Sequence, residues 1–224
     1  MTNSAILVPT RNRPHNIVAL IESLKETDTT AKLIAIVDTD DPQLDTYADL
    51  PIWVHLVSPG PRGMAHPLNA CAQHLIHNED FDNYFFLGDD HRPRTKHWDQ
   101  VWNANLSELG TGLVYGDDLL QGRNLPTAVG MTADIVRALD GMVPQGFAHL
   151  YLDNFWLTLG QDLEMIRYLP ETIIEHLHPI AGKAGWDEGY REVNANEMMS
   201  ADQQAFHDYI AGEDYQQLLD KLRK

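Results

Sequence analysis

The stretch that decides how the chain is interpreted is YFFLGDDHRP, which spans residues 84–93. Its first four residues are apolar or aromatic, which is typical of a short buried strand. The run then stops at Gly88 and at two adjacent carboxylates, Asp89 and Asp90. Two neighbouring negative charges repel each other unless a positive partner lies beside them. A divalent cation is one such partner, because Mg²⁺ and Mn²⁺ prefer oxygen ligands and commonly also hold substrate phosphates. A solvated acidic turn after the strand is the alternative.

Composition indicates an ordinary folded chain rather than a disordered one. Hydrophobic residues make up 43% of the 224 residues and charged residues 22%, and this length fits one large domain or one domain with a small appendage. The formal net charge of −17 argues against a broad electrostatic grip on nucleic acid or anionic membrane. The single cysteine, Cys71, excludes an internal disulfide and a cysteine-rich zinc site. We expect a cytoplasmic protein without a leader segment and without the ~20-residue apolar run that spans a bilayer.

Apolar runs alternate with helical patterns along the first half of the chain. Strands are expected at residues 5–8, 32–37, 52–57 and 84–87, and helices at 14–24 and 65–77. This alternation predicts βαβ units and therefore an α/β fold with a doubly wound, mainly parallel central sheet and helices on both faces.

The second half is less regular. We expect helices at residues 98–109 and 132–139, and short strands at 112–116, 127–130, 167–170 and 172–174. Glycines at 182, 185 and 189 suggest a mobile connection. Ser200 and Gln203 form a capping-box pair at the start of two short helices broken at Gly212. We therefore predict one domain over residues 1–193 and a helical C-terminal extension over residues 194–224.

Polar residues follow three of the expected strands at the edge where such sheets bind ligands. Thr10 and Arg11 follow the first strand, Asp38 follows the second, and Asp89 with Asp90 follows the strand at 84–87. One hydroxyl, one guanidinium and three carboxylates should therefore lie close together. A surface ion pair between Arg11 and Asp38, worth less than about 1 kcal/mol if exposed, is the simpler alternative for those two residues.

Four segments, taken in order, resemble the family 2 type of the GT-A nucleotide-sugar glycosyltransferases. They are ILVPTRNRP at 6–14, VD at 37–38, RGMAHPLN at 62–69 and FLGDD at 86–90, and the resemblance covers roughly residues 5–180. It implies the Rossmann-like GT-A fold and a nucleotide-sugar donor. The residues that it implies for binding this donor are Pro9, Thr10, Arg11, Asp38, Arg62, Gly63, Asn69 and Asp89.

The acidic motif departs from the family's DxD pattern, because Gly88 occupies its first position. If the usual register holds, Asp90 is the metal ligand, and Asp89 approaches the ribose or shares the ion. His91 could replace one of them, since Asp89 and His91 also form a pair separated by one residue.

A second metal ligand is expected from the segment that contains His176 and His178. Two residues separated by one position on a strand point to the same face, so either imidazole could reach inward. The resemblance implies such a late histidine ligand, and we prefer His178 over His176. A surface histidine pair ended by Pro179 is the alternative.

Asp153 is the candidate general base. The resemblance implies an acidic pair near the acceptor, and the sequence has Asp153 followed by Asn154, so only Asp153 can serve. It lies between Leu152 and the aromatic residues at 155–156, where partial desolvation would raise its pKa toward a useful value. An N-cap of a short helix is the alternative.

Two further groups have a less specific interpretation. Asp117 and Asp118 are interpreted as part of a loop that faces the acceptor or solvent. Trp98, Trp102 and Trp156 could stack on sugar rings, although tryptophans four residues apart are more often packed in a core.

The function that we expect is transfer of a sugar from a nucleotide-diphosphate sugar to an acceptor hydroxyl, with Mn²⁺ or Mg²⁺ and with inversion of the anomeric configuration. UDP is the expected nucleotide. The acceptor stays open between a protein side chain, a small molecule, a glycan or lipid-linked sugar, and a modified nucleic-acid base. The alternatives are a metal-dependent phosphohydrolase on an α/β sheet and a non-catalytic nucleotide-sugar binding module.

Overall fold

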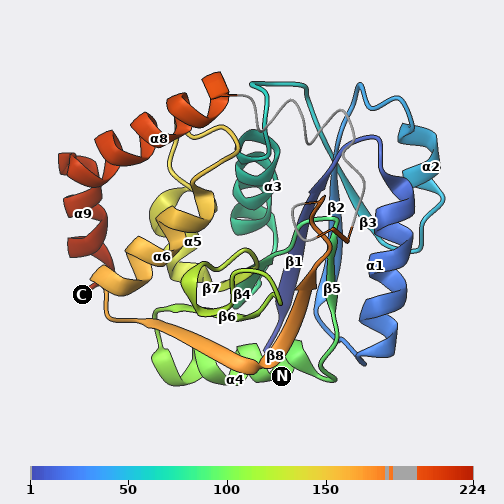
Figure 1. The fold of residues 1–224 in the computed structure, drawn as a ribbon, viewed down its shortest axis with the longest axis horizontal. Helices are drawn as coiled ribbons and strands as arrows, with labels where there is room; N and C mark the ends of the chain where they lie inside the picture. Colours follow the sequence, from blue (N-terminus) through green and yellow to red (C-terminus); the bar gives the residue numbers. More distant parts are fainter. Residues whose placement is uncertain (1, 180–181, 184–195, 224) are drawn as a thin grey trace.

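The computed structural model describes residues 2–179, 182–183 and 196–223, and its centre is one mixed β-sheet (Figure 1). The sheet has eight strands in the order β3-β2-β1-β4-β7-β6-β8-β5. The strands are β1 Ser4–Thr10, β2 Lys32–Asp38, β3 Trp53–Val57, β4 Asn83–Phe86, β5 His91–Pro93, β6 Leu113–Asp117, β7 Val129–Thr132 and β8 Ile166–His176. The two short strands expected at 167–170 and 172–174 are one long strand.

Helices follow the strands much as the hydrophobic patterns indicate. They are α1 Pro14–Glu26, α2 Leu44–Ala48, α3 Ala65–Asn78, α4 Trp98–Leu109, α5 Ala133–Leu139, α6 Leu152–Asp162, α8 Asn196–Ala211 and α9 Glu213–Leu222, with one 3-10 turn at Gly122–Asn124. The doubly wound α/β architecture predicted from the sequence is confirmed.

Alternate side chains of β1 enter two separate cores. Ala5 and Leu7 belong to one buried cluster, and Ile6 and Val8 belong to the other, as the two-residue period of a strand requires. The first cluster is filled by α3, α5, α6 and α9, and the second by α1, α2 and α4. Figure 1 shows α1 and α2 on the right of the sheet and α5, α6, α8 and α9 on the left.

The sheet is parallel on one side and mixed on the other. Strands β3, β2, β1 and β4 pair in parallel, whereas β7 runs antiparallel between β4 and β6. The cause is the connection from β6 to β7, which contains only a 3-10 turn. A parallel return needs a longer crossover, usually a helix. Strand β8 then pairs in parallel with β6 and antiparallel with the short β5.

The tryptophans of α4 belong to the core. Trp98 and Trp102 are fully buried, and their rings meet edge to face at 4.9 Å. Trp156 is also buried, and its indole N–H donates to the carbonyl of Met142 at 2.8 Å. The core packing preferred for Trp98 and Trp102 is thus confirmed, and the interpretation of Trp156 as a residue that stacks on a sugar is wrong.

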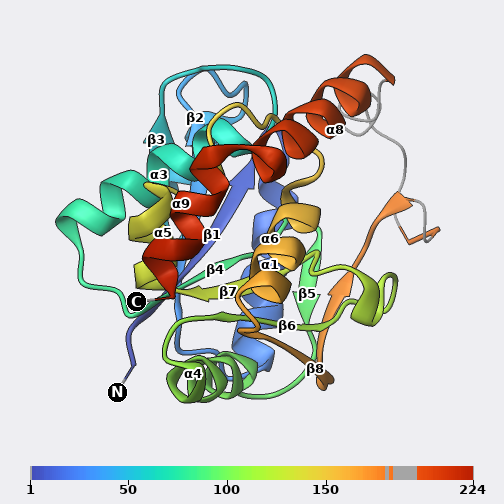
Figure 2. The same cartoon turned by 90° about the vertical axis from the view of Figure 1, so that its left-hand side faces the viewer.

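The C-terminal helices pack on the same core as the sheet (Figure 2). Tyr215, Leu218 and Leu219 of α9 are buried in the first cluster, and the Tyr215 hydroxyl donates to Asp162 of α6 at 2.7 Å. Helix α8 already begins at Asn196, so the capping box expected at Ser200 is wrong. The predicted boundary between residues 193 and 194, and the glycines at 185 and 189, lie outside the described residues. No helix among those described is long and apolar enough to cross a membrane.

Candidate metal and nucleotide-sugar site

The structure brings the polar residues at the ends of β1 and β2 to one edge of the sheet, with those that follow β4. The Thr10 hydroxyl donates to Oδ2 of Asp89 at 2.7 Å. The Arg11 guanidinium lies 3.1 Å from Asp38 and 2.6 Å from Asp40, with half of its side chain exposed. Burial raises the pKa of Asp38, and Arg11 opposes this shift. The ion pair considered as the simpler alternative is thus present at the edge where ligands bind.

Asp89 is buried, and its carboxylate contacts the end of β1, the loop that follows and the first turn of α1. Besides Thr10, the side chains of Arg13 and Asn16 lie 3.5 and 3.2 Å from its Oδ1. Burial raises its pKa, as does the charge of Asp90, while Arg13 lowers it. These contacts fix the β1–α1 loop to the end of β4, so Asp89 is placed to hold the loop in shape.

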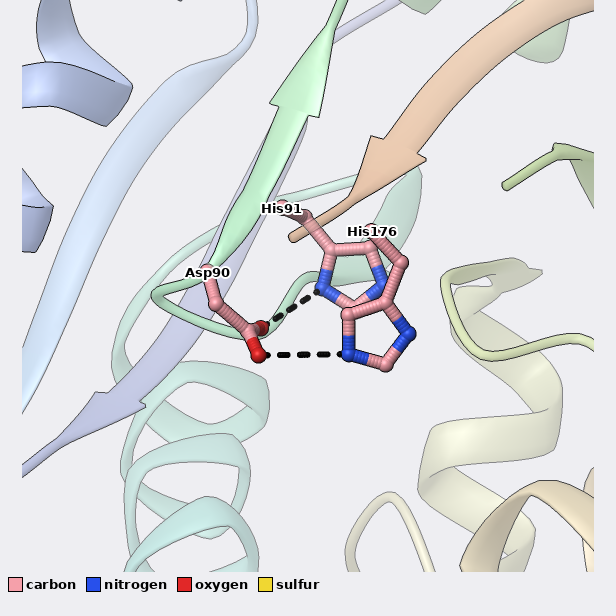
Figure 3. Close-up of side chains that lie close together, drawn as sticks. All are labelled: Asp90, His91 and His176. Atoms are coloured by element: carbon pink, nitrogen blue, oxygen red, sulfur yellow. Dashed lines mark hydrogen bonds and ion pairs between the residues drawn. The ribbon is translucent and has the colours of Figure 1, made fainter. Parts of the chain in front are cut away.

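Asp90 faces two histidines from strands that pair with each other (Figure 3). His91 of β5 is opposite His176 of β8 in the antiparallel register. Directly opposite side chains lie close together, and here the two rings stack with centroids 4.2 Å apart. Oδ2 of Asp90 is 3.2 Å from Nε2 of His176, and Oδ1 is 3.5 Å from Nδ1 of His91. Ligand atoms of all three lie within 4.8 Å of one another, a spacing that suits a metal ion.

The two histidines of this cluster differ in what their nitrogens already bind. Nδ1 of His91 accepts the backbone N–H of Gly88 at 2.8 Å, and its Nε2 lies 3.4 Å from the Thr127 hydroxyl. Burial lowers the pKa of His91, which fits a neutral ring that accepts at Nδ1. The pair of ligands that best fits a divalent ion is therefore Asp90 with His176. His91 packs against both, because it lies 3.5 Å from Asp90 and stacks on the His176 ring.

Gly88 has a steric reason for its place in this motif. A Cβ at this position would lie 2.6 Å from Oδ1 of Asp90 and 2.8 Å from Nδ1 of His91. The residue that departs from the family's acidic pattern is therefore the one that leaves room for the cluster.

Asp118 lies beside the other nitrogen of the His176 ring. Its Oδ2 is 3.9 Å from Nδ1 of His176, which is beyond hydrogen-bond distance, and Nδ1 has no hydrogen-bond partner among the described residues. The backbone N–H of His176 donates to the Asp118 carbonyl at 3.0 Å. Burial lowers the pKa of His176, but the carboxylates of Asp118 and Asp90 outweigh burial and raise it to about 9. A carboxylate behind a ligating histidine commonly orients the ring toward the metal.

This role of Asp118 was not predicted from the sequence, which indicated only a loop that faces the acceptor or solvent. Its carboxylate is buried, accepts the N–H groups of residues 120–122 at Oδ1 and binds the Thr127 hydroxyl at Oδ2. Although burial opposes the shift, these donors and His176 hold the pKa of Asp118 well below its usual range.

His178 lies just beyond the end of β8. Its ring meets that of His176 edge to face at 5.1 Å, and burial and the charge of His176 lower its pKa. Both imidazoles of the predicted pair are thus near Asp90, but His176 is the one whose Nε2 is at hydrogen-bond distance from it.

Asp153 lies in the first turn of α6. Tyr151 occupies the N-cap position, so the interpretation of Asp153 as the cap is wrong. Oδ1 of Asp153 accepts the N–H of Asn154 at 2.9 Å. Burial raises its pKa, and the charges of His176 and Asp118 are close enough to affect it. The candidate base therefore lies within electrostatic reach of the candidate metal site.

The expected glycine-rich stretch contacts a loop rather than the strand ends. Oδ1 of Asn69 accepts the N–H groups of Met142 and Val143, and its Nδ2 donates to the Val143 carbonyl. Gly63 has a φ of 107°, and a Cβ there would lie 2.2 Å from the carbonyl oxygen of Ala148. The exposed Arg62 precedes it on the same turn.

Two other residues of the site escaped the sequence prediction. The side chains of Arg13 and Asn16 contact Asp89. Arg13 belongs to the Thr-Arg-Asn-Arg-Pro segment, from which only Thr10 and Arg11 were predicted as site residues, and Asn16 follows that segment by two residues. Pro9, also predicted, is a partly buried residue of β1 next to Thr10.

Comparison with solved structures identifies the class of fold. The mannosyltransferase PcManGT from Pyrobaculum calidifontis, in complex with GDP-Man and Mn²⁺, aligns with a TM-score of 0.64 and 14% identity over 99% of this chain and 69% of its own. Glucosyl-3-phosphoglycerate synthase from Mycobacterium tuberculosis, in complex with Mn²⁺, UDP and phosphoglyceric acid, aligns with a TM-score of 0.61 and 12% identity over 89% of this chain and 77% of its own.

The S. aureus protein TarS aligns with a TM-score of 0.59 and 15% identity over 94% of this chain but only 44% of TarS, so the chain spans less than half of that relative's length. No protein-family model and no curated protein matches the sequence. The chain has the fold of the GT-A glycosyltransferases over nearly its whole length.

Proposed function

We propose that the protein is a metal-dependent, inverting glycosyltransferase that uses a nucleotide-diphosphate sugar. The observation that carries the proposal is the pair formed by Asp90 and His176, whose oxygen and nitrogen lie 3.2 Å apart at the ligand edge of a GT-A fold. A carboxylate and an imidazole that converge from two separate strands suit Mn²⁺ or Mg²⁺. The Mn²⁺ complexes of PcManGT and of glucosyl-3-phosphoglycerate synthase support this choice.

The metal would supply Lewis-acid stabilisation of the departing diphosphate. Asp90 and His176 would hold it, with His178 close enough to complete the set. His176 must be neutral to ligate, so binding of the ion would release the proton that Asp90 and Asp118 hold on its ring.

The donor would lie along the ends of β1 and β2. Pro9, Thr10, Arg11 and Asp38 would contact the nucleotide, and Arg62 with Gly63 would lie beside the diphosphate. Asn69 and Asp89, predicted as donor contacts, have their polar atoms engaged with the protein. We therefore assign both to positioning the neighbouring loops. Solved relatives contain UDP in one case and GDP-Man in another, so both nucleotides belong in the test.

Asp153 would perform the proton transfer. Its carboxylate would accept the proton of the acceptor hydroxyl while the acceptor oxygen bonds to the anomeric carbon of the donor. The bond from that carbon to the phosphate oxygen would break, and the nucleoside diphosphate would leave from the opposite face, which inverts the configuration. A raised pKa makes the carboxylate a better base.

The test is release of nucleoside diphosphate from UDP- and GDP-sugars, with Mn²⁺ and with a chelator. We expect metal-dependent release that increases when the acceptor is supplied from a panel of proteins, glycans, small molecules and nucleic acids. Release of inorganic phosphate from phosphate esters without sugar transfer would favour a phosphohydrolase instead. Tight binding of the nucleotide sugar, with no release of nucleoside diphosphate in the presence of any acceptor in the panel, would favour a binding module.

A further inference from the structure

The loop that precedes α6 lies directly on the turn that contains Gly63. The carbonyl of Ala148 accepts the N–H of Ala65 at 2.9 Å. A Cβ on Gly63 would lie 2.2 Å from that carbonyl oxygen and 3.0 Å from Cβ of His149. Residues 148–149 therefore cover the turn to which the donor's diphosphate is assigned above.

One carboxylate from the C-terminal helices holds this loop. Asp202 of α8 is 2% exposed, and it accepts three consecutive backbone N–H groups, those of Ala148, His149 and Leu150, at 2.7 to 2.9 Å. Hydrogen bonds to a charged acceptor are stronger than those to neutral acceptors. The direction in which the His149 side chain leaves the backbone is thus set by α8.

The imidazole of His149 has a polar atom that the described part of the chain does not satisfy. Its Nδ1 is buried and has no hydrogen-bond partner among the described residues. Burial lowers the pKa of His149 to about 4, and the charges of Asp202, Arg13 and Asp90 also act on the ring. The ring is therefore neutral near pH 7, and it lies within electrostatic reach of the proposed metal ligand. A buried group without a partner is costly and calls for an explanation.

The sugar of the donor is the group that fits this place. The reacting carbon must lie between the diphosphate, which the metal at Asp90 would hold, and the acceptor oxygen beside Asp153. His149 lies against the Gly63 turn, to which the diphosphate is assigned, and belongs to the loop that leads into α6, the helix that contains Asp153. A neutral imidazole has one N–H donor and one acceptor nitrogen, which matches a hydroxyl, whereas a phosphate oxygen could use only the N–H.

We propose that His149 hydrogen-bonds a hydroxyl of the donor sugar and that Asp202 is the positioning residue that aims it there. This role rests on the proposed function, and it adds a residue that distinguishes the nucleotide sugar from the nucleotide alone.

The test is a calorimetric comparison of UDP-glucose with UDP, and of GDP-mannose with GDP, each in the presence of Mn²⁺. The measured quantity is the ratio of the Kd of the nucleotide sugar to the Kd of the matching nucleotide. His149→Ala should raise this ratio about tenfold, the loss of one well-placed hydrogen bond, and leave the Kd of the nucleotide unchanged. His149→Asn keeps a donor and an acceptor and should recover part of the ratio.

Two further variants separate a direct role from a structural one. His207→Ala removes an exposed histidine of α8 and should leave the ratio unchanged. Asp202→Asn should raise the ratio, and adding it to His149→Ala should raise it no further, because both changes remove the same contact.

An unchanged ratio in His149→Ala, or an equal loss of affinity for sugar-bearing and sugar-free nucleotide, would overturn the role of His149 while leaving the proposed function standing. Failure of the wild-type protein to bind any of these nucleotides with Mn²⁺ would overturn the proposed function and this role together.

Discussion

Gly88 and Asp90 share one small volume at the end of β4. A methyl group on Gly88 would come within 2.6 Å of a carboxylate oxygen of Asp90, closer than such atoms approach in proteins. The Asp90 side chain would move to relieve this clash, because a carboxylate can rotate away whereas the backbone at the end of a strand cannot.

Gly88→Ala should therefore displace Asp90 and weaken Mn²⁺ binding by about tenfold or more, equivalent to at least ~1.4 kcal/mol, with a small change in melting temperature. Calorimetric titration of Mn²⁺ in the presence of UDP measures this affinity. Gly212→Ala, which adds a methyl at the α8–α9 junction where φ is −86°, is the control. Wild-type Mn²⁺ affinity in Gly88→Ala would contradict the assigned geometry.

Asp153 combines a raised pKa with a position close to the charges of His176 and Asp118. A base is active only when deprotonated, so the transfer rate should fall as the pH drops through the raised pKa of Asp153 and should be constant above it. Asp153→Asn should lower kcat by about 10²- to 10⁴-fold with little change in the Kd of the donor. Profiles of kcat/KM against pH check this. A variant that keeps the wild-type rate would remove Asp153 from the mechanism.

At the scale of elements, the site depends on two segments that carry no ligand. Strand β5 is only three residues long, yet its pairing with β8 sets His91 opposite His176. The loop between β6 and β7 folds around the Asp118 carboxylate, which also faces the other side of the His176 ring. The rigidity of the cluster therefore comes from a strand pair and a loop rather than from the acidic motif itself.

Asp118→Asn should destabilise the protein by about 2 kcal/mol, because several donors lose a charged acceptor. The folded-state pKa of Asp118 is below its unfolded value, so its carboxylate stabilises the fold above the unfolded pKa of about 4. The stability difference between wild type and variant should be full above that pH and shrink as the pH falls further. Urea unfolding at several pH values measures the effect.

Asp117→Asn is the matched control, since Oδ1 of Asp117 accepts the backbone N–H of Leu119, a smaller set of donors than Asp118 has. Equal losses of stability in the two variants would contradict the anchoring role of Asp118.

For the whole molecule, much of the fold could be predicted because buried parallel strands appear as apolar runs that end in polar residues. Ligands bind at the carboxyl ends of such strands, so Thr10, Asp38 and Asp89 could be predicted to lie at one edge of the sheet from the sequence alone. The antiparallel direction of β7 follows from the short connection between β6 and β7 and was not predicted. The pairing of β5 with β8 was not predictable, because it joins segments far apart in sequence and has no local pattern.

The candidate site, like the fold, could be predicted only in part. The strand ends predicted the place of Asp90, and the resemblance to the glycosyltransferase family predicted a late histidine beside it, which is where His176 lies. The hydrogen bonds of Asp89 and Asn69 to neighbouring segments could not be predicted, because they depend on which polar groups the tertiary fold brings to each side chain. Asp118 and Asp202 were missed for the same reason.

The C-terminal helices form part of the main core, and one cooperative unit follows from this packing. Leu219 of α9 is 4% exposed in the cluster that also contains Leu7 of β1. Leu219→Ala should therefore cost about 3 kcal/mol and shift a single unfolding transition measured by two spectroscopic probes. Leu119→Ala, at a side chain that is 49% exposed, should change stability little. Two separate transitions, with only the minor one affected by Leu219→Ala, would support an independent C-terminal unit instead.

The central claim is that Asp90 holds a divalent metal through which a nucleotide sugar binds. The most direct measurement is calorimetric titration of UDP- and GDP-sugars into the wild-type protein and Asp90→Asn, each with Mn²⁺ and with a chelator. We predict binding by the wild-type protein that requires Mn²⁺, and loss of that Mn²⁺-dependent binding in a folded Asp90→Asn variant. Full Mn²⁺-dependent affinity in Asp90→Asn would contradict the account.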